Sequence, residues 1–322
     1  MTVELTVALP NFGSYLRGVT WRQFFDLARM ADDFGVDRIV IADHVVMGGN
    51  TDAYPWGEFV VPADAPYLEP MIMLAGMAAV TTRVRLSTGI LIAPLRPAAV
   101  LAKMAATLDV LSDGRLDLGV GVGWQREEYE AVGLRFEERW QRLTDTMLAC
   151  RSLWARGPAT FSSKTVAFTG IYCEPKPVQE GGVPIWLGGG LTVPNVQRLA
   201  SWADGWIPIP VNGEEPESIV TTVANGTPAI RAAWAQAGRD PAGLRVRPPL
   251  PLLRTATRGP HDLARSVAMV PALVTAGATD VSVPMHAFCR DLTCAESFFA
   301  ELTTRFRDAL EGGAGTWARS TV

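Results

Sequence analysis

The feature that most constrains the fold is an alternation of short apolar segments with longer helical segments along the chain. Several of the short segments are continuous apolar runs, which is typical of parallel strands that helices cover on both faces. The predicted strands are Glu4–Ala8, Arg38–Ile41, Val84–Thr88, Leu116–Val120, Pro184–Leu187, Gly205–Ile207, Arg245–Leu253 and Asp280–Pro284.

Helical patterns fill the intervals between these strands. In Trp21–Phe34, for example, Phe24, Leu27 and Ala31 fall on one apolar stripe. Strands that alternate with helices in this way predict a single α/β domain over residues 1–322, folded as a (β/α)8 TIM barrel with loop insertions. A doubly wound sheet is the alternative, but no linker or composition break divides the chain. The other predicted helices are Pro97–Leu111, Arg139–Trp154, Pro194–Ala203, Ser218–Ala237, Asp262–Ala276 and Ala295–Leu310.

Two segments are longer than ordinary connections between barrel elements. At 322 residues the chain exceeds a typical barrel of about 250 residues. The surplus is concentrated in the insertions Asp43–Tyr67 and Gly157–Val183. The first follows the second strand, at the end where barrels build their active sites, so we expect it to lie over a functional cleft. The second is predicted to form a small hairpin with a loop.

Composition excludes several classes of protein. Lys and Arg total 29 against 33 Asp and Glu, a net charge of −4, so a nucleic-acid partner is not expected. No apolar run reaches the about 18 residues of a membrane helix, and no signal peptide is recognisable. The four cysteines, which lack CxxC spacing, predict free thiols and a cytoplasmic location. They are Cys150, Cys173, Cys289 and Cys294.

Three histidines are too far apart in sequence to suggest a metal site, so none is expected. His44 directly follows Asp43 and the second strand, where it could face the pocket as a proton donor; the alternative is a bond to loop backbone. His286 follows the eighth strand and could face the same pocket. His261 is more typical of a helix cap or of exposed surface. Glu127 and Glu128 open a helix, where carboxylates complement the helix dipole.

Glycines mark a second group of candidates. Gly119, Gly121 and Gly123 form a GxGxG string, but Trp124 interrupts the GxGxxG pattern of a dinucleotide site. The string could instead let the backbone approach a flat ligand closely.

A glycine triplet ends the fifth predicted strand. Gly188, Gly189 and Gly190 precede a helix, so their backbone N–H groups could bind a phosphate; a flexible turn is the alternative. After the third strand, Thr88, Gly89 and Ile90 suggest either a strained bulge behind a flat ring or an ordinary strand.

These motifs together resemble those of the luciferase-like flavin and deazaflavin oxidoreductase superfamily. The resemblance covers about residues 4 to 210 and is closest to the branch that uses coenzyme F420. It is carried by the stretches RIVIADHV, TGILIAPLRPAAVLAKMAATLDVLSDGRLDLGVGVGWQREEYEAVGLRFEERWQRLTDTM, PIWLGGG and ADGW.

The resemblance implies a barrel, a cis peptide at Gly89–Ile90 behind the cofactor ring, His44 near the reactive ring edge and a cofactor phosphate at the glycine triplet. It implies F420, or alternatively FMN, as the cofactor, and His44 as the catalytic residue. The predicted cofactor-binding residues are His44, Thr88, Gly89, Ile90, Gly121, Gly123, Trp124, Gly188, Gly189 and Gly190.

The chain also departs from the family pattern. Trp124 stands where sugar-phosphate dehydrogenases of the superfamily carry a catalytic Glu, which puts a sugar-phosphate substrate in doubt. Trp140 and Thr146 stand where close relatives have Gly and Glu, and both are interpreted as structural. From about Val211 onward the match is loose.

Three hypotheses follow from the resemblance. The first is hydride transfer between F420 and a small organic substrate. The second is an FMN-dependent two-component monooxygenase that receives its cofactor from a separate reductase. The third is a non-catalytic flavin-binding barrel. An apolar substrate pocket is suggested by Trp56, Phe59 and Ile90, and a homodimer without nucleic-acid or membrane partners is expected.

Overall fold

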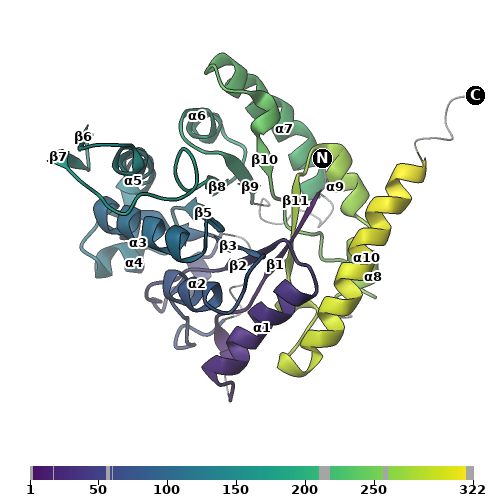
Figure 1. Cartoon of the computed structure of the whole chain (residues 1–322). Helices are drawn as coiled ribbons and strands as arrows, with labels where there is room; N and C mark the ends of the chain where they lie inside the picture. The colour runs from purple at the N-terminus through teal and green to yellow at the C-terminus, as the bar shows by residue number, and fades with distance from the viewer. Residues whose placement is uncertain are drawn as a thin grey trace, which may run out of the picture.

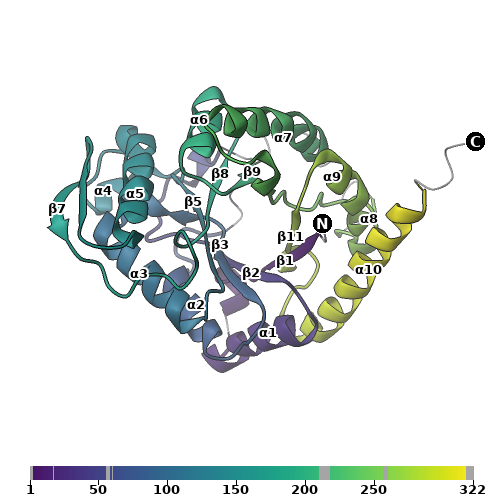
Figure 2. The ribbon, with the colours of Figure 1, turned by 45° about the horizontal axis from the view of Figure 1, so that its top comes forward.

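Parallel strands form a ring that helices surround (Figure 1, Figure 2). The computed structural model describes residues 3–16, 18–55, 59, 61–209, 218–256 and 260–316. Around the ring the strands follow the order β10-β9-β8-β5-β3-β2-β1-β11, which confirms the predicted (β/α)8 barrel. Their bounds are β1 (Glu4–Ala8), β2 (Arg38–Ile41), β3 (Arg85–Thr88), β5 (Leu116–Gly121), β8 (Ile185–Gly189), β9 (Gly205–Pro208), β10 (Arg245–Val246) and β11 (Asp280–Pro284).

The ring closes between the β10 segment and β11. The predicted strand Arg245–Leu253 is wrong in its length, because the Pro-rich stretch that begins at Pro248 lacks the N–H donors of a regular ladder. Closure instead uses individual bonds. Ser282 N donates to Pro248 O at 2.9 Å, and Leu250 N donates to Ser282 O at 2.8 Å. The closing segment therefore follows β11 without forming a long strand.

The helices cover the outside of the ring (Figure 2). Pro271 lies in the first turn of a new helix that begins at Val270, so the predicted helix Asp262–Ala276 is two helices. The helix α2 was not predicted; its cap is Glu69, which accepts from Ile72 N at 2.8 Å. No described helix has the length and apolarity that a membrane span requires. The helices are α1 (Trp21–Asp33), α2 (Pro70–Ala78), α3 (Ala98–Leu111), α4 (Arg126–Ala131), α5 (Arg139–Trp154), α6 (Val193–Ser201), α7 (Ser218–Gln236), α8 (Leu263–Val267), α9 (Val270–Ala276) and α10 (Ala295–Thr316).

Both insertions lie outside the strands of the barrel. The second contains an antiparallel pair, β6 (Ala159–Ser162) and β7 (Ala167–Ile171), as its sequence predicts. The first is tied down at its far end, where the buried side chain of Asn11 donates to Ala42 O at 2.9 Å and to Leu68 O at 2.7 Å. These bonds hold the returning chain against the segment that follows β1.

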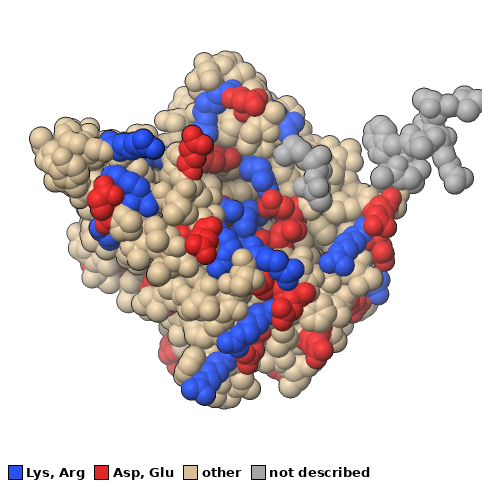
Figure 3. All heavy atoms as spheres, in the orientation of Figure 1, with Lys and Arg blue, Asp and Glu red and all other residues tan. Residues whose placement is uncertain are grey.

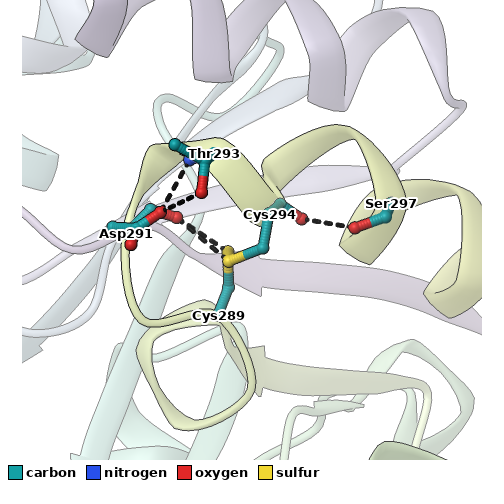
Figure 4. Close-up of a disulfide and its surroundings, with 5 residues drawn as sticks. All are labelled: Cys289, Asp291, Thr293, Cys294 and Ser297. Carbon is teal, nitrogen blue, oxygen red and sulfur yellow. Dashed lines mark hydrogen bonds between the residues drawn. A yellow bond between two sulfur atoms is a disulfide. The ribbon is translucent and has the colours of Figure 1, made fainter.

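The prediction of four free thiols is wrong for one pair. Cys289 and Cys294 form a disulfide, with their Cα atoms 5.7 Å apart (Figure 4). The turn between them is stabilised by Asp291, whose Oδ1 accepts from Thr293 N at 2.8 Å. This local turn brings two cysteines together that have no recognisable motif. Cys150 and Cys173 are free, as predicted, and both are buried.

Charged residues close the N-terminal end of the barrel. Arg38 begins β2 and is 2% exposed; its Nε donates to Asp117 Oδ2 at 2.7 Å and its Nη2 lies 2.8 Å from Glu4 Oε2. The same guanidinium pairs with Asp280, the first residue of β11. Arg245 bonds both Glu4 and Asp280. Figure 3 shows basic and acidic side chains side by side over β1, β2 and β3.

These ion pairs keep the buried carboxylates charged. Burial alone would raise the pKa of Asp117, but Arg38 and Arg85 lower it to about 2. Each described carboxylate in this network therefore faces at least one guanidinium.

Candidate active site

The opposite, C-terminal end of the barrel opens into a cleft of about 850 Å³. Its lining comes from segments that follow β1, β2, β3, β5, β8, β9 and β11, because the ends of parallel strands meet at one end of a barrel. The lining is mostly apolar and aromatic, with a few polar groups placed among the rings.

Ile90 forms the floor of this cleft. The Gly89–Ile90 peptide bond is cis, as the resemblance predicts. A Cβ at Gly121 would overlap Ile90 Cδ1, and a Cβ at Gly188 would lie 2.6 Å from Ile90 Cγ2. Two glycines from neighbouring strands thus make the space in which the Ile90 side chain packs.

Asp43 holds the segment that follows Ile90 in place. Its side chain is buried, and Oδ2 accepts from Ile92 N at 2.8 Å. Both of its oxygens also accept from Arg96, at 2.7 and 3.1 Å. Arg96 in turn bonds Glu69 at 2.7 Å, so the charge of Asp43 is engaged in holding the segment in place.

His44 also lines the cleft and is oriented by a buried carboxylate. Its side chain is 11% exposed, and Nδ1 lies 3.1 Å from Oε2 of the fully buried Glu128. The other oxygen, Oε1, accepts from Val45 N at 2.9 Å. The tautomer in which Nδ1 donates to Oε2 satisfies both carboxylate oxygens and turns Nε2 toward the cleft.

The beginning of the first insertion is bonded to the start of α4, the helix that carries Glu128. Gln125, the buried residue before α4, accepts from Gly48 N at 2.8 Å and donates to Gly48 O at 3.1 Å. Gly48 packs so closely on Glu127 that a Cβ there would lie 2.6 Å from Glu127 Cγ. The insertion is thereby held beside the cleft near His44.

Aromatic rings form one wall around His44. The His44 ring makes edge contacts with Tyr67, Phe59 and Trp124 at centroid distances of 5.0, 5.9 and 6.0 Å. Tyr54 packs against Phe59 and Trp124 at 5.1 and 5.3 Å. The wall excludes water from the imidazole and offers faces for a flat or apolar ligand.

The glycine triplet lies on the far side of the cleft. All three glycines line it, and a Cβ at Gly189 would lie 2.9 Å from Asn195 Nδ2, whereas Gly190 has open space in front of it. The carbonyl of Gly190 accepts from Asn195 Nδ2 at 2.9 Å. The helix α6 begins directly afterwards, with Thr192 as its cap.

Arg139, the first residue of α5, adds a positive charge to the same lining. Its Nη1 donates to Phe136 O at 3.0 Å and its guanidinium lies 3.8 Å above the Phe136 ring. Its buried Nε has no partner, and no described carboxylate forms an ion pair with it. An unpaired donor and an uncompensated charge are suited to a bound anion.

The structure brings most of the predicted site residues together. Thr88 and Gly121 stand behind the lining; Thr88 Oγ1 donates to Gly119 O at 2.7 Å and ties two strands together. Phe59 lines the cleft as predicted, while Trp56 lies outside the described residues. The residues that line the cleft are His44, Gly89, Ile90, Gly123, Trp124, Gly188, Gly189 and Gly190.

The sequence analysis did not identify the site roles of two residues, Glu128 and Arg139. The helix-dipole role assigned to Glu128 is incomplete, because its carboxylate is buried against His44 instead of lying on the surface. Its position shortly after GVGVGW was the available signal. Arg139 was missed because only the packing of α5 against the glycine triplet's side of the cleft brings it into the lining.

Comparison with protein families gives one match over most of the chain. A family model described as luciferase-like monooxygenase matches residues 1–272. An uncharacterised protein of Mycobacterium tuberculosis, Rv0953c, is 33% identical over 219 residues, which cover 66% of this chain and 74% of that protein.

Two further likenesses concern an enzyme and a solved structure. An F420-dependent glucose-6-phosphate dehydrogenase of Nocardia farcinica is 31% identical over 229 residues, which cover 68% of this chain and 61% of that protein. The crystal structure of monooxygenase RslO1 from Streptomyces bottropensis superposes with a TM-score of 0.76 at 18% identity, covering 96% of this chain and 99% of that one. The second likeness shows the shared fold.

Proposed function

The chain belongs to the luciferase-like monooxygenase family, and from this membership we propose an oxidoreductase that transfers a hydride between coenzyme F420 and a small organic substrate. The observation that carries the proposal is the Arg139 guanidinium, which has no described carboxylate partner and lines the same cleft as the glycine triplet and His44. A cleft with an anion-binding side and a shaped apolar floor suits a ligand that has both a phosphate and a flat ring.

The residues present fit such a cofactor. Gly188–Gly190 and Arg139 would hold its phosphate through backbone N–H groups and the guanidinium. Ile90 would support one face of the cofactor ring. Its side chain packs against Gly121 and Gly188, which hold it in place on the side away from the cleft.

When bound, the cofactor supplies the hydride chemistry. His44 contributes the proton. Glu128 holds the Nδ1 proton and orients the ring, so Nε2 accepts a proton from the substrate during oxidation or returns one during reduction. The wall of Tyr54, Phe59 and Trp124 keeps bulk water away from Nε2.

The F420-dependent relative supports this choice of cofactor, and its activity is carried over only as part of the proposal. The test is a titration of the purified protein with F420, followed by cofactor fluorescence and repeated with FMN. Binding of F420 at micromolar concentration is expected. No binding at concentrations on the order of tens of micromolar contradicts the proposal, and oxygen consumption with reduced FMN would support a monooxygenase in its place.

A variant pair tests the phosphate contact. Arg139→Met removes the unpaired guanidinium from the lining and is expected to weaken F420 binding about tenfold or more. Arg142→Met is the matched control, because Arg142 lies on the same helix and already pairs with Glu138 at 3.2 Å. Equal effects of the two substitutions would place the phosphate elsewhere.

A further inference from the structure

His286 faces the cleft from a side that the proposed cofactor contacts do not use. It lies in a short 3-10 turn, Met285–Ala287, directly after β11. Around the ring, β11 is separated from the glycine triplet on β8 by both β9 and β10, and its neighbour on the other side is β1. The phosphate contacts and His286 therefore belong to different sides of one cleft.

A row of aromatic rings connects His286 to His44. Phe12, which follows β1, makes an edge contact with His286 at a centroid distance of 5.7 Å and stacks on Tyr67 at 5.0 Å. Tyr67 in turn meets the edge of His44 at 5.0 Å. This row is the part of the lining between the two histidines, and its rings carry no formal charge.

The charged groups of the described lining lie elsewhere or are paired. Asp43 is bound by Arg96, and Arg139 begins α5, where its guanidinium lies over the Phe136 ring. A charged substrate group placed against the stacked rings of Phe12 and Tyr67 would lose its water without gaining a counter-ion, which is costly. The row thus favours an uncharged ligand.

The His286 side chain is the exposed polar group at the end of this row. Its ring nitrogens form no hydrogen bond with the described residues, so they are available to a ligand in the cleft. The surrounding protein and the neighbouring His261 lower the pKa of His286, which keeps the ring neutral near pH 7. A neutral imidazole offers one donor and one acceptor.

The turn that carries His286 is held by the disulfide loop. Cys289 N donates to Met285 O at 2.9 Å, and Phe288 N donates to the same oxygen at 3.0 Å. The Cys289–Cys294 disulfide then closes the loop that leads into α10 (Figure 4). A fixed turn on a barrel strand is a suitable place for a group that must recognise a ligand.

We propose that His286 and Phe12 form the substrate-recognition side of the cleft, where the imidazole hydrogen-bonds the single hydroxyl or carbonyl oxygen of an otherwise apolar, uncharged substrate. This rests on the proposed function, because it assigns the Arg139 side to the cofactor. His286 would position the substrate oxygen, while His44 exchanges the proton.

Nuclear magnetic resonance of histidine side chains tests the assignment directly. The chain has three histidines, so ring-labelled histidine gives three sets of signals, which single His→Gln variants assign. The cofactor-loaded protein is titrated with benzyl alcohol, toluene, benzoate and benzylammonium, which share a ring and differ in polar group and charge. Benzyl alcohol is expected to bind most tightly and to shift the His286 signals.

A variant series separates recognition from structure. His286→Leu is expected to weaken benzyl alcohol binding about tenfold and to leave toluene binding nearly unchanged. His286→Asn, which keeps a donor and an acceptor, is expected to recover part of the preference. The proposal is overturned if benzyl alcohol fails to shift the His286 signals, if the charged probes bind equally well, or if His286→Leu binds both neutral probes like the unmodified chain.

The cofactor titration keeps the two proposals apart. If F420 and FMN both fail to bind the unmodified protein, the proposed function fails, whatever the probes do to His286. If F420 binds with equal affinity to the unmodified chain and to His286→Leu, the cofactor side stands. The probe results then decide the substrate side alone.

Discussion

The two ends of the barrel treat charge in opposite ways. At the N-terminal end, the buried guanidinium of Arg38 meets Asp117, Asp280 and Glu4, and every partner is engaged. At the C-terminal end, Arg139 has no carboxylate partner among the described residues, and the ring nitrogens of His286 form no hydrogen bond with them.

This difference separates stability from function. Compensated charges hold neighbouring strands together and have no remaining capacity for a ligand. Uncompensated groups in a cleft contribute little to folding and are suited to binding or chemistry. Substitutions at the two ends should therefore change different measurements.

The largest effect is expected at the N-terminal end. Arg38→Met leaves Asp117 and Asp280 buried without their shared cation, which should lower the free energy of unfolding by about 3–5 kcal/mol. Denaturant unfolding measures this loss. Arg29→Met is the control, since its pair with Asp26 is half exposed and worth about 1 kcal/mol or less. Similar losses of unfolding free energy in Arg38→Met and Arg29→Met would show that the buried network stabilises the fold no more than an exposed ion pair does.

At the C-terminal end, His44→Gln should reduce turnover by about 10²-fold or more, because the substrate proton loses its acceptor. Cofactor affinity should change by less than about threefold. Steady-state kinetics and a cofactor titration measure the two quantities. Glu128→Gln keeps a hydrogen-bonding group at Nδ1 and should have a smaller effect on turnover. Equal loss of turnover and affinity, or loss of neither, would count against the role of His44.

Gly190→Val tests whether the triplet's open side belongs to the cofactor. Because no described atom lies within 4 Å of a Cβ added at this glycine, the fold should be unaffected, while cofactor affinity should fall about tenfold. Gly49→Val is the control, since Gly49 is equally open and lies outside the lining. Gly189→Val should lower both affinity and stability, because its side chain would press on Asn195. Unchanged affinity in Gly190→Val would move the phosphate away from the triplet.

The smallest effect is a pH dependence of stability at His286. Its pKa lies below the unfolded value of about 6.5, so on acidification the unfolded chain binds the proton first and stability is lost. His286→Phe should remove this part of the loss below pH 6.5, by less than about 1 kcal/mol because water in the cleft screens the ring. Unfolding curves from pH 5 to 8 measure it; identical pH profiles would show that the ring is not held neutral.

The strand pattern predicted the barrel because buried parallel strands are short apolar runs whatever their partners. The predicted element bounds were wrong where proline interrupts the pattern of strands and helices. Pro248 and its neighbours shorten β10, and Pro271 divides one predicted helix. The Cys289–Cys294 pair was not predictable, because its proximity comes from a turn at Asp291 without a recognisable motif.

The site was predictable where it depends on strand ends. His44 and the glycine triplet directly follow strands, so any barrel brings them to one end. The contributions of Glu128 and Arg139 depend on how α4 and α5 pack against that end, which sequence spacing does not specify. The position of His286 at the end of β11 was recognisable, whereas its contact with Phe12 required the structure.

The most direct test of the whole account is the melting temperature of the purified protein with F420, with FMN and without cofactor. A ligand that binds only the folded chain must raise this temperature. The account predicts a rise with F420 that is reduced in Arg139→Met and retained in Arg142→Met. No rise with F420, or an equal rise in both variants, would contradict it.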